Sequence, residues 1–376
     1  MKLVFILQSL AKSGGLERTI TDKANYMAEQ GHSVTIVTYE QGQHANAYEL
    51  LHSVKCVDLD CRRFTLYQSP KYMQLYKLLQ MKRTFVKRLY KLLGQLLPDM
   101  VIMTTCSDDF RREIVAATRR RGIKLVMESH TAYYYDKQTS NLLKRLYVRR
   151  DIHFIKKCDA LIALTEGDSA FWRKYVSNVL LLHNPVSFYA ENISATVREK
   201  GKIISVGRLD KPKRFDVLID AFAIVAPKFP EWHLEIYGNG SNLVQLETQI
   251  ERLHLSGRVT IHQPTPEIFK EYLSSQFLAF CSENEGFCLV LIEAMACGLP
   301  VLTVDCPYGP AEIVENGHTG WLCKMDTDEI AERMEWMISH EKERREMGRL
   351  GHENVRKYKK EKVMKEWEKA YSSLLV

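Results

Sequence analysis

The sequence predicts an α/β protein with two domains, each a doubly wound parallel sheet with helices on both faces. Three observations lead to this prediction. The chain has 376 residues, which is too long for one compact core and suits two domains of roughly 190 residues. A strand, a helix and a second strand follow one another at the start, as a parallel sheet requires. The same alternation restarts at Gly201.

The first half begins with an apolar strand, and polar turns separate the elements that follow. Lys2–Leu7 is a near-continuous apolar run, typical of a strand buried on both faces. A glycine turn at 13–15 precedes a helical pattern that Gly31 ends, and Ser33–Thr38 is the second strand. Further strands are expected at Met100–Thr104, 125–129, 160–164 and 179–182.

The second half repeats this alternation of strands and helices. Strands are expected at Lys202–Val206, His233–Tyr237, Val259–His262, 277–281 and Val301–Val304, and helices at Phe215–Val225, 243–253 and 288–296. The predicted domains are residues 1–187 and 188–358, and a final helix at 359–376 is expected to pack back on the first. Open α/β sheets bind ligands beyond the carboxyl ends of their strands, so the site is expected in a cleft between the domains.

Composition and charge narrow the class of protein. No run of about 18 apolar residues occurs, so the sequence predicts no membrane-spanning helix. The nine scattered cysteines form no Cys-x-x-Cys pair, which favours a reducing cytoplasm. The formal net charge of +7 is unevenly divided, because residues 1–190 carry 29 Lys and Arg against 17 Asp and Glu. A basic first half predicts contact with an anionic surface or substrate.

The most informative stretch runs from Glu285 to Pro300, after a predicted strand and into a predicted helix. Gly286 is expected to open the turn, so that amides near 288–290 face outward and attract an anion with the helix dipole. Glu285 and Glu293 are about two helical turns apart and are expected on a similar face, where carboxylates can accept from sugar hydroxyls. Taken alone, they could equally be ordinary helix glutamates.

A second cluster, 207–216, follows another predicted strand and carries four cations. Cations at a helix start oppose the helix dipole unless an anion is bound. Arg208 can grip phosphate oxygens with a fork of N–H groups, and Lys213 can add a mobile charge. The alternative is a basic loop that only faces solvent.

Shorter features lie in the first half and at its end. Gly14 and Gly15 do not form G-x-G-x-x-G, but they would let the backbone approach a ligand closely. His130 ends the strand at 125–129, where it could donate to substrate oxygens or line a reaction centre; a histidine satisfied inside the fold is the alternative. Asn184-Pro185 is interpreted as a simple turn.

The segment 62–98 is basic, with nine Lys and Arg and no acidic residue. Within it, residues 72–93 place apolar side chains at helical spacing, among them Leu75, Leu78, Leu79, Phe85 and Leu89. Such a helix could lie on an anionic bilayer, or it could pack in the core and expose a basic face. The sequence leaves both interpretations open.

At these residues the chain resembles the family 4 retaining glycosyltransferases of GT-B fold, over nearly its whole length. The E-x7-E signature matches Glu285 to Pro300, and the diphosphate loop matches Gly207, Arg208 and Lys213. The N-terminal Gly-Gly-x-Glu matches 14–17, and 305–310 resembles a pattern in bacterial enzymes that assemble lipid-linked or surface oligosaccharides. Two departures are Asn184-Pro185-Val186, for the usual Asn-Gly-Val-Asp, and Arg214, where glycine is frequent.

The resemblance implies two Rossmann-like domains facing a cleft, the first binding acceptor and the second the nucleotide sugar. Arg208 and Lys213 would neutralise the donor diphosphate, Glu285 would bind the sugar, Glu293 the ribose, and His130 would lie by the reacting centre. The expected catalytic residues are His130, Glu285, Arg208 and Lys213. The expected donor-binding residues are Gly14, Gly15, Gly207, Arg208, Lys213, Gly238, Glu285, Gly286, Phe287, Cys288, Leu289, Val290 and Glu293.

These inferences predict a cytoplasmic glycosyltransferase, and peripheral attachment at the inner face of the cell membrane is left open. It would move a hexosyl or N-acetylhexosaminyl group from a nucleotide-diphosphate sugar, by resemblance a UDP-sugar, to a glycan or lipid-linked hydroxyl in surface polysaccharide assembly. No metal or other cofactor is expected, because fixed cations and helix amides would replace a divalent ion. No nucleic-acid partner is expected, because no such binding motif occurs. A GT-B epimerase or hydrolase and a non-catalytic nucleotide-sugar-binding protein are the alternatives.

Overall fold

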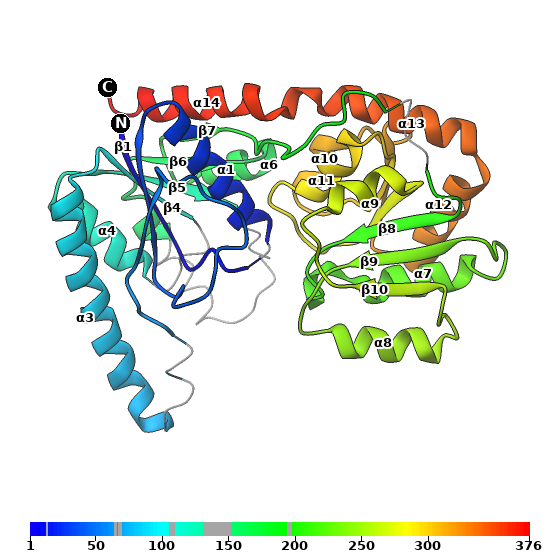
Figure 1. The fold of residues 1–376 in the computed structure, drawn as a ribbon, viewed down its shortest axis with the longest axis horizontal. Coiled ribbons are helices and arrows are strands. Elements are labelled where there is room, and N and C mark those ends of the chain that lie inside the picture. Colours follow the sequence, from blue (N-terminus) through cyan, green and yellow to red (C-terminus); the bar gives the residue numbers. More distant parts are fainter. Residues whose placement is uncertain (13, 64–65, 67–69, 105–109, 131–151, 194–197) are drawn as a thin grey trace. The chain divides into compact units, whose positions relative to one another are not determined.

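The computed structural model describes residues 1–12, 14–63, 66, 70–104, 110–130, 152–193 and 198–376. The chain divides into two compact units (Figure 1). Unit 1 contains residues 1–182 together with 364–376, and unit 2 contains residues 183–363. The division after Leu182 comes a few residues before the expected boundary at 187, and it cuts the final helix near its beginning.

Within the described residues, unit 1 contains a seven-stranded parallel sheet in the order β3-β2-β1-β4-β5-β6-β7. Its strands are β1 (Lys2–Leu7), β2 (Ser33–Thr38), β3 (Lys55–Asp58), β4 (Met100–Thr104), β5 (Lys124–Ser129), β6 (Ala160–Ala163) and β7 (Val179–Leu181). The strand order reverses at β1, which pairs with both β2 and β4. This reversal is the switch point of a doubly wound sheet, so the carboxyl ends of these strands are the expected location of a site.

Helices cover this sheet, and aromatic side chains fill part of its core. The helices are α1 (Gly15–Glu29), α3 (Lys71–Leu96), α4 (Arg111–Arg120), α6 (Glu166–Trp172) and the unit 1 part of α14 (Lys360–Ser373). Phe85 of α3 stacks on Phe110 with ring centroids 4.0 Å apart. Tyr39 meets both rings edge-on. These contacts fix the C-terminal half of α3 against the sheet.

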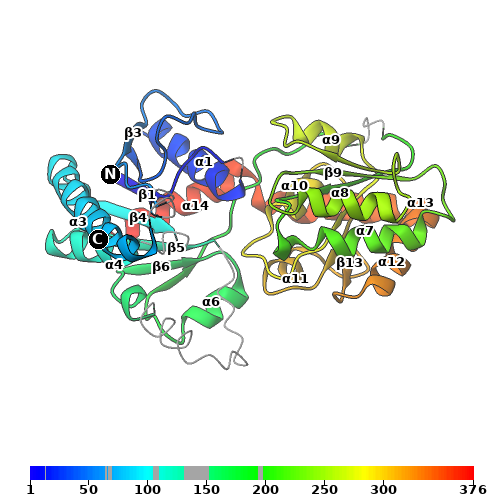
Figure 2. The ribbon, with the colours of Figure 1, turned by 90° about the horizontal axis from the view of Figure 1, so that it is seen from below.

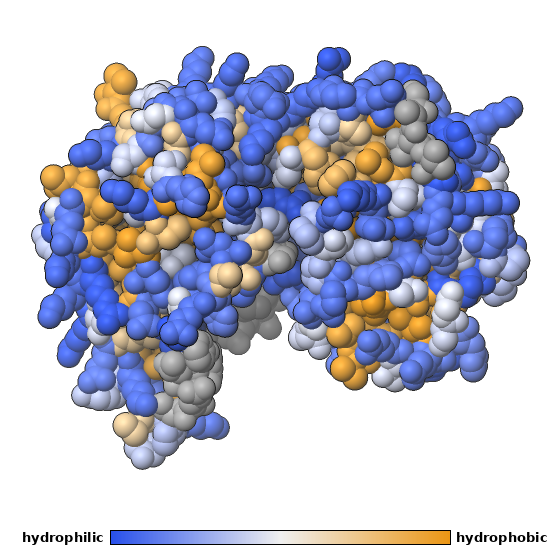
Figure 3. Space-filling view, in the orientation of Figure 1, coloured by the Kyte–Doolittle hydropathy of each residue, from blue (hydrophilic) through white to orange (hydrophobic). Residues whose placement is uncertain are grey.

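The two halves of α3 have different environments. Phe85, Leu89 and Leu93 are completely buried, which confirms the core-packing interpretation for this half. The expectation that Phe85 and Leu89 could face lipid is therefore wrong. At the other end of the helix, Tyr72 is 82% exposed and Leu75 68% exposed. In Figure 3 hydrophilic side chains stand out along the edge of unit 1 where α3 runs.

The described part of unit 2 contains a six-stranded parallel sheet in the order β10-β9-β8-β11-β12-β13. Its strands are β8 (Lys202–Val206), β9 (His233–Tyr237), β10 (Val259–His262), β11 (Phe277–Phe280), β12 (Val301–Val304) and β13 (Gly320–Cys323). The helical segments are η1 (Lys211–Lys213), α7 (Phe215–Val225), α8 (Leu243–Arg252), α9 (Ile268–Ser274), α10 (Leu289–Ala296), α11 (Gly309–Ile313), α12 (Thr327–Ser339), α13 (Glu341–Asn354) and η2 (Val355–Tyr358). In Figure 2 α7 and α8 lie in front of these strands.

Candidate active site

The loop after β8 is fixed against the loop after β9. The amide of Gly207 donates to the Tyr237 carbonyl at 3.1 Å, and the amide of Leu209 donates to the Asn239 carbonyl at 2.9 Å. A Cβ atom added at Gly238 would lie 2.0 Å from the Gly207 carbonyl oxygen. Gly238 is therefore required for the close approach of the two loops, which hold the backbone of the cationic loop in place.

Arg208 extends from this loop into solvent. Its side chain is 69% exposed, and its Nη1 lies 3.1 Å from Oδ2 of Asp210. An exposed ion pair of this kind contributes only about 0–1 kcal/mol. The guanidinium can therefore leave Asp210 for a bound phosphate at little cost.

Lys213 forms an ion pair with Glu285, which comes from the loop after β11. Both side chains are largely buried. Burial lowers the pKa of Lys213, but the neighbouring Glu285 carboxylate has the greater combined effect, so the net pKa is raised above its usual value. Lys213 is thus a fixed positive charge at neutral pH, and it holds Glu285 beside the cationic loop.

The backbone at Arg214 shows why glycine is frequent at this position in the family pattern. Its φ of 48° is in the left-handed region, where glycine is preferred. Its Nε donates to Asp216 at 3.0 Å and its Nη1 donates to Glu283 at 3.1 Å. Arg214 therefore adds no uncompensated charge to the loop, because both carboxylates hold its guanidinium.

The loop after β12 anchors Glu285. The Glu285 amide donates to the Pro307 carbonyl at 2.9 Å, and the Tyr308 amide donates to the Glu285 carbonyl at 3.1 Å. A Cβ atom at Gly309 would lie 3.0 Å from the Phe287 carbonyl carbon, so this glycine permits the close packing. Residues 305–310 resemble a pattern in bacterial oligosaccharide-assembling enzymes, but no local pattern in the sequence indicates that they pair with Glu285.

The N-terminus of α10 follows this anchored loop. The helix begins at Leu289, and Cys288 before it has a φ of 58°. The residue in the left-handed conformation at this helix start is therefore Cys288, whereas Gly286, which was expected to open the turn, has no positive φ. Phe287 is buried and packs on His183 and Tyr358, with centroids 5.5 and 5.3 Å away. The first amides of α10, at Leu289 and Val290, lack carbonyl partners within the helix, as at any helix start.

Glu293 lies inside α10 and is 5% exposed. The Tyr272 hydroxyl donates to Glu293 Oε2 at 3.4 Å. Glu285 and Glu293 do not share a helical face, so that expectation is wrong. The physical reason is that Glu285 precedes the helix, and the left-handed residue at Cys288 interrupts a helical path between them.

The predicted glycines of unit 1 lie at the start of α1. Gly14 is the N-cap of α1, and Gly15 is its first residue. A Cβ atom at Gly14 would lie 2.4 Å from Oε2 of Glu17. Gly14 therefore leaves room for the Glu17 carboxylate near the positive end of the helix.

His130, after β5, is turned into unit 1. Its side chain is 4% exposed, and Nε2 lies 2.7 Å from Oε2 of Glu128. Burial lowers the pKa of His130, although the Glu128 carboxylate partly opposes this effect. A carboxylate only accepts hydrogen bonds, so Nε2 donates its proton to Glu128. His130 was expected to donate a hydrogen bond to substrate. Its Nε2 proton cannot do so in this arrangement, because it is donated to Glu128.

The segment at Asn184 is not the simple turn that the sequence indicates. Asn184 is 3% exposed, and its Oδ1 finds no hydrogen-bond partner among the described residues. The Val186 amide donates to the Tyr358 carbonyl at 2.9 Å, and Val186 forms a parallel bridge with Lys359. The segment therefore pairs with the end of η2 and with Lys359, the residue before α14, inside unit 2.

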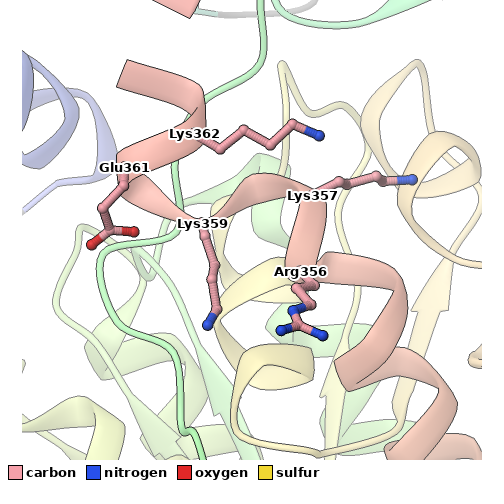
Figure 4. Close-up of a pocket in the computed structure, with 5 residues that line it drawn as sticks. All are labelled: Arg356, Lys357, Lys359, Glu361 and Lys362. Atoms are coloured by element: carbon pink, nitrogen blue, oxygen red, sulfur yellow. The ribbon is translucent and has the colours of Figure 1, made fainter. Parts of the chain in front are cut away.

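Unit 2 also has a cationic hollow outside the predicted site. The cavity of about 490 Å³ is lined by Arg356, Lys357, Lys359, Glu361 and Lys362. Figure 4 shows the Lys357 and Lys362 side chains extending in one direction, and those of Arg356 and Lys359 in another. Lys359 already pairs with Glu191 at 2.6 Å. None of the predicted site residues lines this hollow.

Two observations on the described residues concern metal ions and membranes. Among these residues, no group of three or more His, Cys, Asp or Glu side chains is placed to hold a metal ion. No helix in the described part of the chain has the length and apolarity needed to cross a bilayer.

Family models match nearly the whole chain. Residues 13–188 match the model described as Glycosyltransferase Family 4, and residues 190–354 match Glycosyl transferases group 1. An uncharacterized glycosyltransferase of Haemophilus influenzae is 26% identical over 97% of this chain and 98% of its own. An alpha-1,4-N-acetyl-D-galactosaminyltransferase of Campylobacter jejuni, named for a PP-undecaprenol-linked acceptor, is also 26% identical, over 98% and 97%.

A solved structure matches the full length as well. Staphylococcus aureus TarM, solved with UDP and alpha-GlcNAc-glycerol, covers 100% of both chains with a TM-score of 0.80. The sequence identity is 15%, so this likeness shows the fold alone. The fold is GT-B, as the sequence resemblance implied.

Proposed function

This chain belongs to the family 4 glycosyltransferases of GT-B fold, and we propose that it moves a sugar from a UDP-sugar to a hydroxyl of a lipid-linked or surface glycan, with retention of anomeric configuration. The observation that carries the proposal is the Lys213–Glu285 pair beside the exposed Arg208 and the N-terminus of α10. UDP in TarM and the lipid-linked acceptor named for the Campylobacter relative support the choice of donor and acceptor.

The proposed catalysis is stabilisation of the leaving group. When the sugar departs, negative charge develops on the diphosphate. Arg208 and Lys213 would share that charge with the amides of Leu289 and Val290. Interloop hydrogen bonds and the ion pair hold the cationic loop in place before reaction, so little reorganisation is needed as the charge appears.

The two glutamates would divide the recognition of the donor. Glu285 adjoins the cationic loop, so its carboxylate is suited to accept from hydroxyls of the transferred sugar. Glu293, inside α10, would accept from the ribose. His130 would lie by the reacting centre, with its Nε2 donating to Glu128.

We propose that the reaction needs no metal ion. Fixed cations can take the part that a divalent ion plays in other glycosyl transfers. Activity should therefore persist in excess EDTA, and a loss restored by Mg²⁺ or Mn²⁺ would contradict this part of the proposal.

A ligand panel followed by turnover is the decisive test. UDP and UDP-sugars should raise the melting temperature by mass action more than ADP or GDP counterparts. Transfer to undecaprenyl-diphosphate glycans should then be measured by mass spectrometry, with the anomeric configuration read by NMR. Donor turnover without acceptor would favour an epimerase or hydrolase, and stabilisation without any turnover would favour a binding protein.

We also propose that unit 1 docks on an anionic leaflet through the exposed side of α3, from Tyr72 to Lys91. Tyr72, Leu75, Tyr76 and Leu79 are exposed there. Exposed basic side chains follow along the helix at Arg83, Lys87 and Lys91. Each cation near an anionic surface adds about 1 kcal/mol, and buried apolar groups add to this.

Vesicle co-sedimentation tests the docking proposal. Replacing Leu75 and Leu79 by Ser, or Arg83 and Lys87 by Gln, should weaken binding to phosphatidylglycerol vesicles. Lys82→Gln is a poorer probe, because Lys82 already pairs with Glu113 at 3.3 Å. If the wild-type protein ignores these vesicles at low salt, the docking proposal is wrong, while glycosyl transfer to a soluble acceptor is unaffected.

A further inference from the structure

A buried network of charged and aromatic residues surrounds Glu128 in unit 1. The Glu128 side chain is completely buried at the end of β5. Lys23 of α1 donates to its Oε2 from 2.8 Å, and His130 donates to the same oxygen from 2.7 Å. The Tyr371 hydroxyl of α14 donates to Oε1 at 2.5 Å. Trp367, one turn earlier in α14, lies with its ring 3.1 Å from Lys23 Nζ.

The network is charged even though water is excluded from it. The Lys23 side chain is also completely buried, and burial lowers its pKa to about 8. Burial alone would raise the pKa of Glu128, but Lys23 and His130 together lower it to about 2. At neutral pH Glu128 is therefore an anion paired with the Lys23 cation, and Tyr371 stays a neutral donor because burial raises its pKa.

This arrangement determines the state of the His130 ring. Among the described residues, the charged groups that act on the ring include the Glu128 carboxylate and, beyond it, the Lys23 ammonium. The carboxylate can only accept, so the neutral ring carries its proton on Nε2. Nδ1 then has a lone pair and can only accept a hydrogen bond.

A buried charge pair is weak evidence for stability, because removing both charges from water costs as much as their attraction returns. A carboxylate that orients an imidazole is, in contrast, a recurring way to fix its tautomer. The position of Glu128, two residues before His130 and held from α1 and α14, suits this second role.

We propose that Glu128 is a positioning residue that fixes the tautomer and orientation of His130. In this proposal, Tyr371 and Trp367 of α14 hold Glu128 and its partner Lys23 in place. This proposal rests on the proposed function, which gives His130 its place beside the reacting sugar. Glu128 acts through His130, because it sets which ring nitrogen carries the proton and which carries the lone pair.

The tautomer can be measured directly in the full chain. Selective ¹⁵N-histidine labelling with two-bond ¹H–¹⁵N correlation distinguishes the Nε2–H and Nδ1–H forms, and His130→Asn identifies the signal. The expected result at pH 7.5 is the Nε2–H form. In Glu128→Gln, whose amide can donate as well as accept, the signal should show a mixture of forms. An Nδ1–H ring in the wild type, or an unchanged ring in Glu128→Gln, would overturn the proposal.

Kinetics test the positioning role separately. Glu128→Gln should lower kcat by about 10- to 100-fold with little change in donor KM, because a misplaced group costs rate rather than ground-state binding. Tyr371→Phe should lower kcat less and leave the tautomer largely intact. Glu128→Gln removes the partner of the buried Lys23 cation, which can disturb folding. The double variant Lys23→Met/Glu128→Gln therefore serves as a second test, because it leaves no unpaired buried charge.

Tyr26→Phe is the matched control. Tyr26 of α1 also donates to a carboxylate of α14, that of Glu368 at 3.4 Å, but outside the network. Its kcat and tautomer should match the wild type. An equal loss of kcat in Tyr26→Phe and Tyr371→Phe would show that helix packing alone matters and would overturn the proposal. If the wild type transfers no sugar at all, the proposed function fails, while the tautomer still shows whether Glu128 fixes the ring.

Discussion

Arg208 and Lys213 carry similar charges, but the structure predicts different consequences when each is removed. Alanine at either position should slow turnover, because both side chains would stabilise the departing diphosphate. Only Lys213→Ala should also destabilise unit 2. The reason is that Arg208 is 69% exposed, whereas Lys213 and Glu285 are 20% and 11% exposed.

The magnitudes follow from these environments. Losing a preorganised charge at the reaction centre costs about 3 kcal/mol, or roughly a hundredfold in kcat/KM. Removing Lys213 also leaves the Glu285 carboxylate without its cation, which costs about 2 kcal/mol of folding free energy. For a domain of this size that is a fall of roughly 4–8 °C in melting temperature. Arg208→Ala should change stability by no more than about 1 kcal/mol.

The assay combines thermal melts without ligand and initial rates of UDP release with acceptor present. Lys211→Ala is the matched control, because Lys211 lies in the same turn and is exposed. It removes the same formal charge and should leave both rate and melting temperature close to the wild type.

Two results would refute the reasoning. Rates within about threefold of the wild type in both Arg208→Ala and Lys213→Ala would remove the diphosphate assignment, since the expected loss is roughly a hundredfold. A similar rate loss in Lys211→Ala would show that the overall charge of the loop, and not the placed side chains, determines the rate.

Further predictions concern the two glutamates, pH and the core. Glu293→Gln should weaken binding of UDP itself, whereas Glu285→Gln should chiefly weaken the sugar-bearing donor; equal losses in titration calorimetry would contradict this division. The pKa of His130 is below its usual 6.5, so the unfolded chain binds the proton more readily; the stability of unit 1 should fall as pH drops below 6.5, less so in His130→Asn. Phe85→Ala should cost about 3–5 kcal/mol by denaturant unfolding, and exposed Leu75→Ala at most about 0.5 kcal/mol.

Buried parallel strands were predictable from the sequence because both faces are apolar. β1, β2, β4 and β8 begin and end at the expected residues. β3 was not predicted, because it is an edge strand whose burial pattern is half exposed.

The site was only partly predictable, for a related reason. The charged residues that follow the predicted strands indicated that the loops after β8 and β11 hold the cations and the Glu285 carboxylate. The pairing of Lys213 with Glu285 joins residues far apart in the chain, and no local pattern reports it. The left-handed residues of the site are Arg214 and Cys288, neither of which is glycine, the usual indicator; only the resemblance, in which glycine is frequent at the position of Arg214, pointed to one of them.

The discontinuous make-up of unit 1 has a consequence for how the protein is made. Residues 183–363 are one uninterrupted stretch, whereas unit 1 takes its last segment, 364–376, from beyond them. Domains fold as units while the ribosome extends the chain. Unit 1 can therefore be completed only after all of unit 2 has been synthesised, although most of unit 1 is translated earlier. A truncated chain that ends at residue 363 would contain every residue of unit 2, but the Lys23–Glu128 pair of its unit 1 would lack Trp367 and Tyr371.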